Sequence, residues 1–280
     1  MPSGMRFNAR MPEIQHVALV REPGAALNRC ELTHLARVPI DVARARTQHA
    51  NYVAALAALG AAIEWLPPLD HQPDAVFVED TAVIFPEVAV LTWPGVSSRQ
   101  TEVASVAPAL AGYRIVRQVR PPAFLDGGDV LRLGHRVLVG LSSRTNAAGA
   151  AALRDAIAEF GYDVSAVHVR GALHLKSACT AIADDRVVAN LAAIDATLLA
   201  GLAIIEVDER ESRAANTLTL GGVTLVSAAF PRTEERLRGA GVSTRAVDVS
   251  ELEKAESGLT CMSLIFSVGA HDEALGATGP

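Results

Sequence analysis

Short apolar runs recur along the chain in pairs, and each pair follows the same order. A polar residue comes first, followed by a short apolar run, a tight turn and a second apolar run. The turns are Pro-Glu, Gly-His, Asp-Asp and Gly-Gly. Turns of this kind between two apolar runs predict β-hairpins. The four complete pairs begin at Asp80, Asp129, Cys179 and Asn216.

Segments between the hairpins carry apolar residues at helical spacing. The clearest run from Val42 to Leu59, before Gly60, and from Asn146 to Phe160, before Gly161. A glycine directly after a periodic segment is a typical helix stop. Each unit is therefore predicted to be strand, strand, helix and strand, repeating about every 45 residues. Weaker helical patterns cover residues 98–110, 191–202 and 234–237.

A fifth unit begins at Cys261, but only one apolar run, Cys261 to Phe266, follows it. The apolar run from His16 to Glu22 has no partner in the pattern. We expect it to complete the last unit and close a ring, because pairing of terminal strands removes exposed sheet edges. The predicted fold class is α/β, with five small sheets arranged radially. A doubly wound parallel sheet is the alternative, but it has few tight hairpins.

The radial arrangement has a chemical consequence. The polar residues that begin the units would occupy equivalent positions near the centre of the ring, where polar groups form a natural binding site. These residues are Asp80, Asp129, Cys179, Asn216 and Cys261.

The composition is that of a globular protein. Of 280 residues, 50% are hydrophobic and 20% are charged. We expect a single domain over residues 1–280, folded from about residue 14 to residue 268. Residues 1–10 and 269–280 are expected to be loose arms. The net charge of −6 disfavours nucleic-acid binding, and no apolar run reaches the roughly 18 residues of a membrane span. Cys30, Cys179 and Cys261 form no closely spaced pair, so we expect free thiols and a cytoplasmic location.

Acidic residues gather in two segments. PDAVFVED carries Asp74, Glu79 and Asp80 around an apolar run that we expect to be a strand, on which Asp74 and Asp80 would face the same side. Two carboxylates on one side suit a guanidinium group. LDGGDVL places Asp126 and Asp129 around two glycines, which permit a sharp turn or a close approach. A solvated strand end and an ordinary turn are the alternatives.

Other residue types supply a nucleophile and a base. Cys261 stands where a polar loop meets a strand, and His174 precedes a strand in HLKSACT. A thiol becomes reactive where a nearby cation or histidine lowers its pKa. Arg99 and Arg144 lie in serine-rich loops and suit a carboxylate ligand. A core cysteine, a structural histidine and surface arginines are the alternatives for each alone. Together these residues indicate covalent catalysis on a guanidino amino acid.

Seven motifs stand in order between about Val17 and Phe266. They are IDVARARTQHANYV, PDAVFVEDTAV, PGVSSR, LDGGDVL, VGLSSRTN, HLKSACT and SELEKAESGLTCMS. Together they resemble dimethylarginine dimethylaminohydrolase, a family of the pentein superfamily of guanidino-modifying enzymes. The resemblance implies a five-bladed α/β propeller that hydrolyses asymmetric dimethylarginine and monomethylarginine to citrulline. It implies no metal and no organic cofactor. The expected partner is the small-molecule substrate, and the protein would be a monomer or a homodimer.

The resemblance also implies a role for each matching residue. Cys261 would attack the guanidinium carbon, and His174, oriented by Asp126, would protonate the departing amine and then activate water against a covalent thiouronium. The substrate-binding residues would be Asp74, Asp80 and Glu79 around the guanidinium, Arg99 and Arg144 at the α-carboxylate, Leu27 in a mobile lid, and main-chain groups near Ala255 and Glu256 at the α-amino end.

Two other functions stay open at this point. Arginine deiminase uses the same fold and related chemistry but releases ammonia from unmethylated arginine. A non-catalytic pentein would keep the ring as a binding module without the cysteine and histidine. The presence of Cys261 and His174 disfavours the second alternative.

Overall fold

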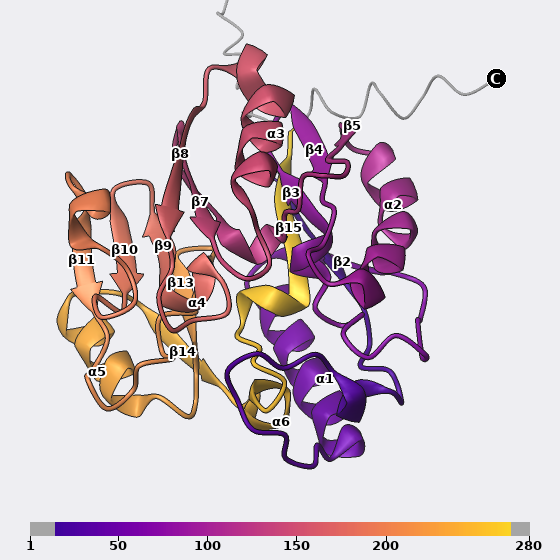
Figure 1. Cartoon of the computed structure of the whole chain (residues 1–280). Coiled ribbons are helices and arrows are strands. Elements are labelled where there is room, and N and C mark those ends of the chain that lie inside the picture. The colour runs from indigo at the N-terminus through magenta and orange to yellow at the C-terminus, as the bar shows by residue number, and fades with distance from the viewer. Residues whose placement is uncertain (1–14, 270–280) are drawn as a thin grey trace, which may run out of the picture.

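Five three-stranded sheets make up the part of the chain described by a computed structural model, residues 15–269 (Figure 1). The predicted loose arms lie outside these residues, apart from Gly269. In four sheets, an antiparallel hairpin is followed by a helical segment and by a third strand parallel to the second. The predicted order of strand, strand, helix and strand is therefore confirmed, although one connection has only a 3₁₀ turn.

The four continuous sheets follow one another along the chain. Their strands are β3 (Ala82–Ile84), β4 (Val88–Leu91) and β5 (Ile115–Gln118); β6 (Val130–Leu133), β7 (Arg136–Leu141) and β8 (Asp163–His168); β9 (Cys179–Ala183), β10 (Arg186–Ala189) and β11 (Ala203–Glu206); and β12 (Leu218–Leu220), β13 (Val223–Ser227) and β14 (Thr244–Val247).

The fifth sheet joins the two ends of the described chain. Strand β1 (Gln15–Val20) lies between β15 (Ser263–Val268) and β2 (Ala61–Trp65). It runs antiparallel to β15, with Val17 opposite Phe266, and parallel to β2. The prediction that the N-terminal strand completes the last unit is confirmed.

Two of the predicted helices begin at a capping side chain. Helix α1 (Val42–Ala58) starts after Asp41, which accepts from the Arg44 N–H, and α3 (Ala147–Ile157) starts after Asn146, which accepts from the Gly149 N–H. Such caps satisfy N–H groups that lack a partner within the helix. The shorter helices are α2 (Ala107–Ala111), α4 (Leu175–Ala178), α5 (Pro231–Gly239) and α6 (Ser250–Glu253). Helices α2, α3 and α5 lie outside the sheets, on different sides of the molecule (Figure 1).

Three local predictions are wrong. PDAVFVED is not a strand but a series of turns leading into a 3₁₀ helix, Val78–Thr81, because its polar groups bond locally: the Phe77 N–H donates to the Asp74 carbonyl. Residues 191–202 form only the 3₁₀ turn Ala196–Leu199, where the Asp195 carboxylate binds the main chain in competition with a helix. Residues 98–110 are mostly a 3₁₀ helix, Ser97–Ser105, followed by α2.

Buried apolar side chains form five clusters, and each cluster includes strands of two sheets. Full burial of an aliphatic side chain contributes about 1.5–3 kcal/mol, so these clusters fix how the sheets pack. Within residues 15–269 no helix has the length and apolar character needed to cross a membrane. Members from the paired sheets are Leu19 and Leu91; Val88 and Val137; Leu138 and Val187; Val188 and Val226; and Leu225 and Val20.

Candidate active site

Four short segments, each just before the first strand of a sheet, come together in space. The 3₁₀ helix Val78–Thr81 contacts two others, Thr260–Met262 and Gly127–Asp129, and the latter contacts α4. These segments precede β3, β15, β6 and β9. The segments that begin four of the units are therefore neighbours in the structure.

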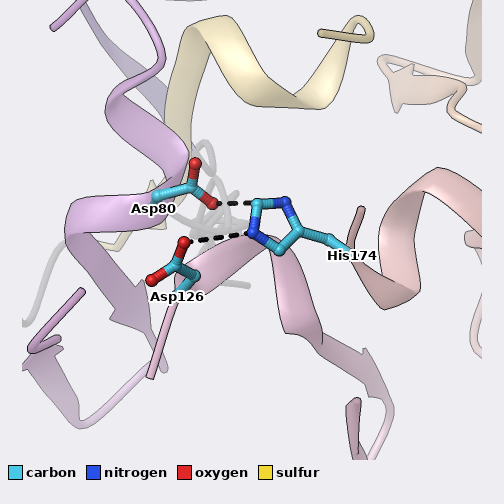
Figure 2. Close-up of side chains that lie close together, drawn as sticks. All are labelled: Asp80, Asp126 and His174. Atoms are coloured by element: carbon cyan, nitrogen blue, oxygen red, sulfur yellow. Dashed lines mark hydrogen bonds and ion pairs between the residues drawn. The ribbon is translucent and has the colours of Figure 1, made fainter. Parts of the chain in front are cut away.

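His174 lies between two carboxylates at this site (Figure 2). Its Nε2 atom is 3.1 Å from Oδ2 of Asp126, and its Nδ1 atom is 3.8 Å from Oδ1 of Asp80. Burial would lower the pKa of the imidazole, but the charges of Asp80, Asp129 and Asp126 outweigh burial and raise it to about 9. His174 is therefore protonated near neutral pH and can act as a general acid.

The same three side chains raise the question of a metal ion. One ligand atom each from Asp80, Asp126 and His174 lies within 4.8 Å of the others, a spacing that could hold a metal ion. A histidine must be neutral to bind a metal, so an ion at this place would have to displace the proton of His174. The absence of a metal, which the family resemblance implies, stays a prediction.

The predicted close approach of the glycine pair is present. A Cβ atom on Gly128 would lie 2.7 Å from Nδ1 of His174 and 2.8 Å from Oδ1 of Asp80. The Gly128 N–H also donates to that Asp80 oxygen, at 2.9 Å. Only glycine leaves room here for the main chain, the imidazole and the carboxylate to pack together.

Asp80 also forms a buried ion pair with Arg99. Nη1 of Arg99 lies 2.5 Å from Oδ2 of Asp80, and the same guanidinium donates to Glu102 and to the Phe77 carbonyl. Burial would raise the pKa of Asp80, but His174 and Arg99 hold it well below its usual range. Arg99 is 3% exposed, and most of its donors bind within the protein. Its contact with a substrate carboxylate stays a prediction.

Cys261 lies in the turn before β15, and its buried thiol is under the influence of two carboxylates. The Gly258 N–H donates to Sγ at 3.3 Å. Burial, with the carboxylates of Glu79 and Asp80, raises the pKa of the thiol to about 12. No hydrogen bond joins Cys261 to His174 within residues 15–269. The thiol is therefore protonated at neutral pH, and a positive charge beside it would favour the thiolate.

Glu79 binds two residues that sequence reasoning did not single out. Its carboxylate lies 2.6 Å from Nζ of Lys176 and accepts from Oγ1 of Thr260 at 2.7 Å. The Thr260 N–H donates to Oδ1 of Asn216. This chain of contacts fixes the residue before Cys261. Lys176 follows His174 by two positions, but its pairing with Glu79 depends on the tertiary fold.

Asp129 is a further carboxylate whose role the sequence did not indicate. It is fully buried and accepts from the Leu175 N–H at 2.9 Å and from Oγ of Ser142 at 2.6 Å. Burial raises its pKa to about 6, opposed by the positive charge of His174. Since Leu175 adjoins His174, Asp129 both places the histidine and stabilises its protonated form. Cys179, by contrast, lies in the apolar core.

Asp129→Asn tests this electrostatic role. Asparagine keeps an oxygen for the Leu175 N–H but removes the charge, so the pKa of His174 should fall by about one unit. A group that acts while protonated loses activity as the pH rises through its pKa. The alkaline limb of the kcat/KM profile should therefore move to lower pH, whereas Asp163→Asn, which removes an exposed carboxylate on β8, should leave it in place. An unmoved limb in Asp129→Asn would contradict the assignment.

The remaining predicted binding residues contact the segment between β1 and α1. The Glu31 N–H donates to both carboxylate oxygens of Asp74, at 3.2 and 3.1 Å. Nη2 of Arg144 donates to Oγ1 of Thr33 at 3.2 Å. Leu27 is fully buried in an apolar cluster. The segment predicted as a lid therefore covers the site in this structure.

Comparison with known proteins finds relatives over most of the chain. The family described as N,N dimethylarginine dimethylhydrolase, eukaryotic, matches residues 34–263. N(G),N(G)-dimethylarginine dimethylaminohydrolase from Streptomyces coelicolor is 42% identical over 88% of this chain and 95% of its own length. The Pseudomonas aeruginosa protein of that name is 32% identical over 81% of this chain and 90% of its own.

Solved structures show the same architecture. A cysteine-to-serine mutant of the Pseudomonas aeruginosa enzyme, complexed with citrulline, has a TM-score of 0.84 at 30% identity, covering 92% of this chain and all of that one. A histidine-to-glycine mutant of a dimethylarginine dimethylaminohydrolase, solved as an adduct with S-methyl-L-thiocitrulline, has a TM-score of 0.83 at 31% identity, covering 89% and 98%.

The fold and the relatives together define a hydrolase with a pentein-type α/β fold. Within that class, the chain belongs to the dimethylarginine dimethylaminohydrolase family.

Proposed function

We propose that the protein hydrolyses Nω-methylated arginines to citrulline and dimethylamine or methylamine. One observation carries the proposal: the turn that holds the buried thiol of Cys261 packs against the turn that holds the carboxylates of Glu79 and Asp80. Such a site is complementary to a cation that is to be attacked by sulfur. The names of the relatives and the citrulline in the related structure support the same substrate class.

Binding of the guanidinium activates the nucleophile. Asp74 and Asp80 accept from its planar N–H groups, and Glu79 adds negative charge on the same side. The positive charge then lies next to Sγ of Cys261 and lowers the pKa of the thiol. The thiol proton leaves to solvent. The nucleophile is thus generated only when a cationic substrate is bound.

Two chemical steps follow. The thiolate forms a bond to the guanidinium carbon, protonated His174 gives its proton to the departing amine, and the C–N bond breaks to leave a thiouronium. Neutral His174 then takes a proton from water, and the resulting hydroxide attacks the same carbon. The C–S bond breaks as the new hydroxyl group releases its proton to solvent, which gives citrulline and the thiolate. Asp126 holds the imidazole in position through both steps.

Trapping of the intermediate tests this order of bond breaking. Enzyme quenched with acid during turnover should carry an adduct on the peptide that contains Cys261. Its mass should be the same whether asymmetric dimethylarginine or monomethylarginine is the substrate, because the methylated nitrogen has already left. An adduct that retains methyl groups, or one on Cys30 or Cys179, would contradict the mechanism.

Asp74→Asn should mainly impair capture of the cation. The Asp74 carboxylate is 5% exposed, and loss of a charge from a buried pair should lower kcat/KM about 100-fold, chiefly through KM. Burial raises the pKa of Asp74 to about 6, so binding by the wild-type enzyme should weaken as the pH falls below that value. KM measured between pH 5 and 8 checks both points, with Asp163→Asn as control. An unchanged KM would refute the role of Asp74.

We also propose that the five sheets close into a ring and that residues 1–280 form a single catalytic domain. The pairing of β1 with both β15 and β2 supports closure, as do the apolar clusters, through which every sheet shares a core with two others. A monomer or homodimer and a cytoplasmic location stay predictions.

Arginine deiminase activity is the alternative. Arginine deiminase from Mycobacterium avium is 27% identical over 70% of this chain but only 60% of its own length. The same residues would release ammonia instead of a methylated amine.

A further inference from the structure

Residues 31–35 of the covering segment touch three ionisable side chains that belong to distant parts of the chain. Two of these contacts, to Asp74 and Arg144, involve groups that we assign to the substrate. The third involves Glu256. The family resemblance predicts that the main chain near this residue contacts the α-amino end of the substrate. In the structure the side chain of Glu256 turns instead toward this segment.

The carboxylate of Glu256 accepts from three consecutive N–H groups. Thr33 donates to both oxygens at 3.0 Å, and His34 and Leu35 donate to Oε1. Successive main-chain N–H groups that point to one anion form a concave binding site, and hydrogen bonds to a charged acceptor are stronger than neutral ones. More than 220 positions separate the two partners along the chain. The contact therefore fixes the segment to the loop that leads to Cys261.

The backbone of Glu256 adopts a conformation that glutamate rarely adopts. Its φ is 58°, and it is the single non-glycine residue with positive φ in residues 15–269. An unfavourable conformation of this kind persists only where surrounding interactions impose it. The three N–H groups provide such interactions. The strain and the contact are independent observations that point to the same residue.

The contacts of the segment divide into two kinds. In the first kind, Asp74 accepts from the Glu31 N–H and Arg144 donates to the Thr33 hydroxyl. Both side chains are also assigned to substrate binding. They must therefore rearrange or be shared when the substrate binds. The contacts with Glu256 use no such group. They can persist whether or not the substrate is present.

Glu256 also lines a cavity next to the loop that leads to Cys261, although Cys261 and His174 are not among its lining residues. The cavity has a volume of about 290 Å³, and His34, Leu35 and Glu256 line it together with Gly258. The N–H of Gly258 is the donor to the Cys261 thiol. The contact between Glu256 and residues 33–35 thus builds one wall of this cavity.

We propose that Glu256 is a positioning residue for the reaction, whose carboxylate anchors residues 33–35 over the site and thereby orders the covering segment before the substrate arrives. This inference rests on the proposed function only where it concerns kinetics. With the anchor in place, the covering segment is already ordered, so the free energy of substrate binding is not reduced by the entropy lost in ordering it. Without it, the substrate must order the segment as it binds, so KM rises more than kcat falls.

Hydrogen–deuterium exchange in the free protein tests the anchor without any need for activity. In Glu256→Ala the amides of Thr33, His34 and Leu35 should exchange at least about tenfold faster than in the wild type, with little change in the sheets. Glu256→Gln, which keeps one acceptor oxygen, should give an intermediate rate. Glu235→Gln, which removes an exposed carboxylate on α5, should match the wild type. Unchanged protection in both Glu256 variants would overturn the anchor.

Kinetics with asymmetric dimethylarginine test the consequence. KM should rise about five- to tenfold in Glu256→Ala and less in Glu256→Gln, with kcat within about twofold of the wild type. Faster exchange with an unchanged KM would overturn the positioning role. If the wild type itself does not turn over this substrate, the proposed function fails, and the exchange result still decides whether the anchor exists.

Discussion

Cys261→Ser should lower citrulline release from asymmetric dimethylarginine by at least about four orders of magnitude. The serine hydroxyl has a far higher pKa than the thiol, so a bound guanidinium is not enough to ionise it. The carboxylates that hold the cation are unchanged, and binding of the substrate, measured by calorimetry, should be largely retained. Steady-state release of citrulline provides the rate.

The matched control for this variant is Cys179→Ala, which removes a different buried thiol. Cys179 is the first residue of β9 and packs in an apolar core that β6 shares, and burial raises its pKa to about 12. Turnover by this variant should remain close to that of the wild type. Substantial activity in Cys261→Ser, or an equal loss in Cys179→Ala, would show that Cys261 is not the nucleophile.

His174→Ala should have the second-largest effect, a loss of about 100- to 10,000-fold in kcat. The amine that leaves is a poor leaving group unless it is protonated, and His174 is the buried acid placed for that step. Its pKa of about 9 means that the acid is present below that pH and is lost above it. The wild-type rate should therefore fall as the pH rises through about 9, and the variant should lack that limb.

A substrate with a better leaving group separates the two tasks of His174. S-methyl-L-thiocitrulline releases methanethiol, which leaves as a thiolate and needs no acid. His174→Ala should therefore still form the Cys261 adduct from this compound, detectable by mass spectrometry, but should hydrolyse it slowly. Loss of adduct formation from this compound in His174→Ala, or an alkaline limb that persists in that variant, would show that the assignment of His174 as acid and base is wrong.

The repeat of hairpins was accessible from the sequence because its signal is local. Paired apolar runs around tight turns predicted β3 with β4 and β12 with β13, and the missing partner of the last run predicted the pairing of β1 with β15. The apolar letters of PDAVFVED misled for the same reason. The apolar side chains of this segment pack from a series of turns and not from a strand. The hydrogen bond from the Phe77 N–H to the Asp74 carbonyl, which closes the first turn, cannot be predicted from the hydrophobic pattern.

The candidate site was predictable only in part. Spacing and residue type suggested the carboxylates and the thiol, and the family resemblance paired His174 with Asp126, which the structure places 3.1 Å apart. Lys176 was missed, and Asp129 was placed near the centre of the ring without a role, because their partners are determined by the packing of separate sheets. The side chain of Glu256 was missed for another reason: three main-chain N–H groups bind it, and main-chain donors have no sequence signature.

The most direct test of the proposed function compares three substrates on the purified protein. Citrulline release would be measured from asymmetric dimethylarginine, monomethylarginine and arginine side by side, with Cys261→Ser as the blank. The account predicts citrulline from both methylated substrates and little from arginine. Arginine as the best substrate would contradict it in favour of a deiminase with the same residues, and citrulline from none of the three would refute the proposed reaction.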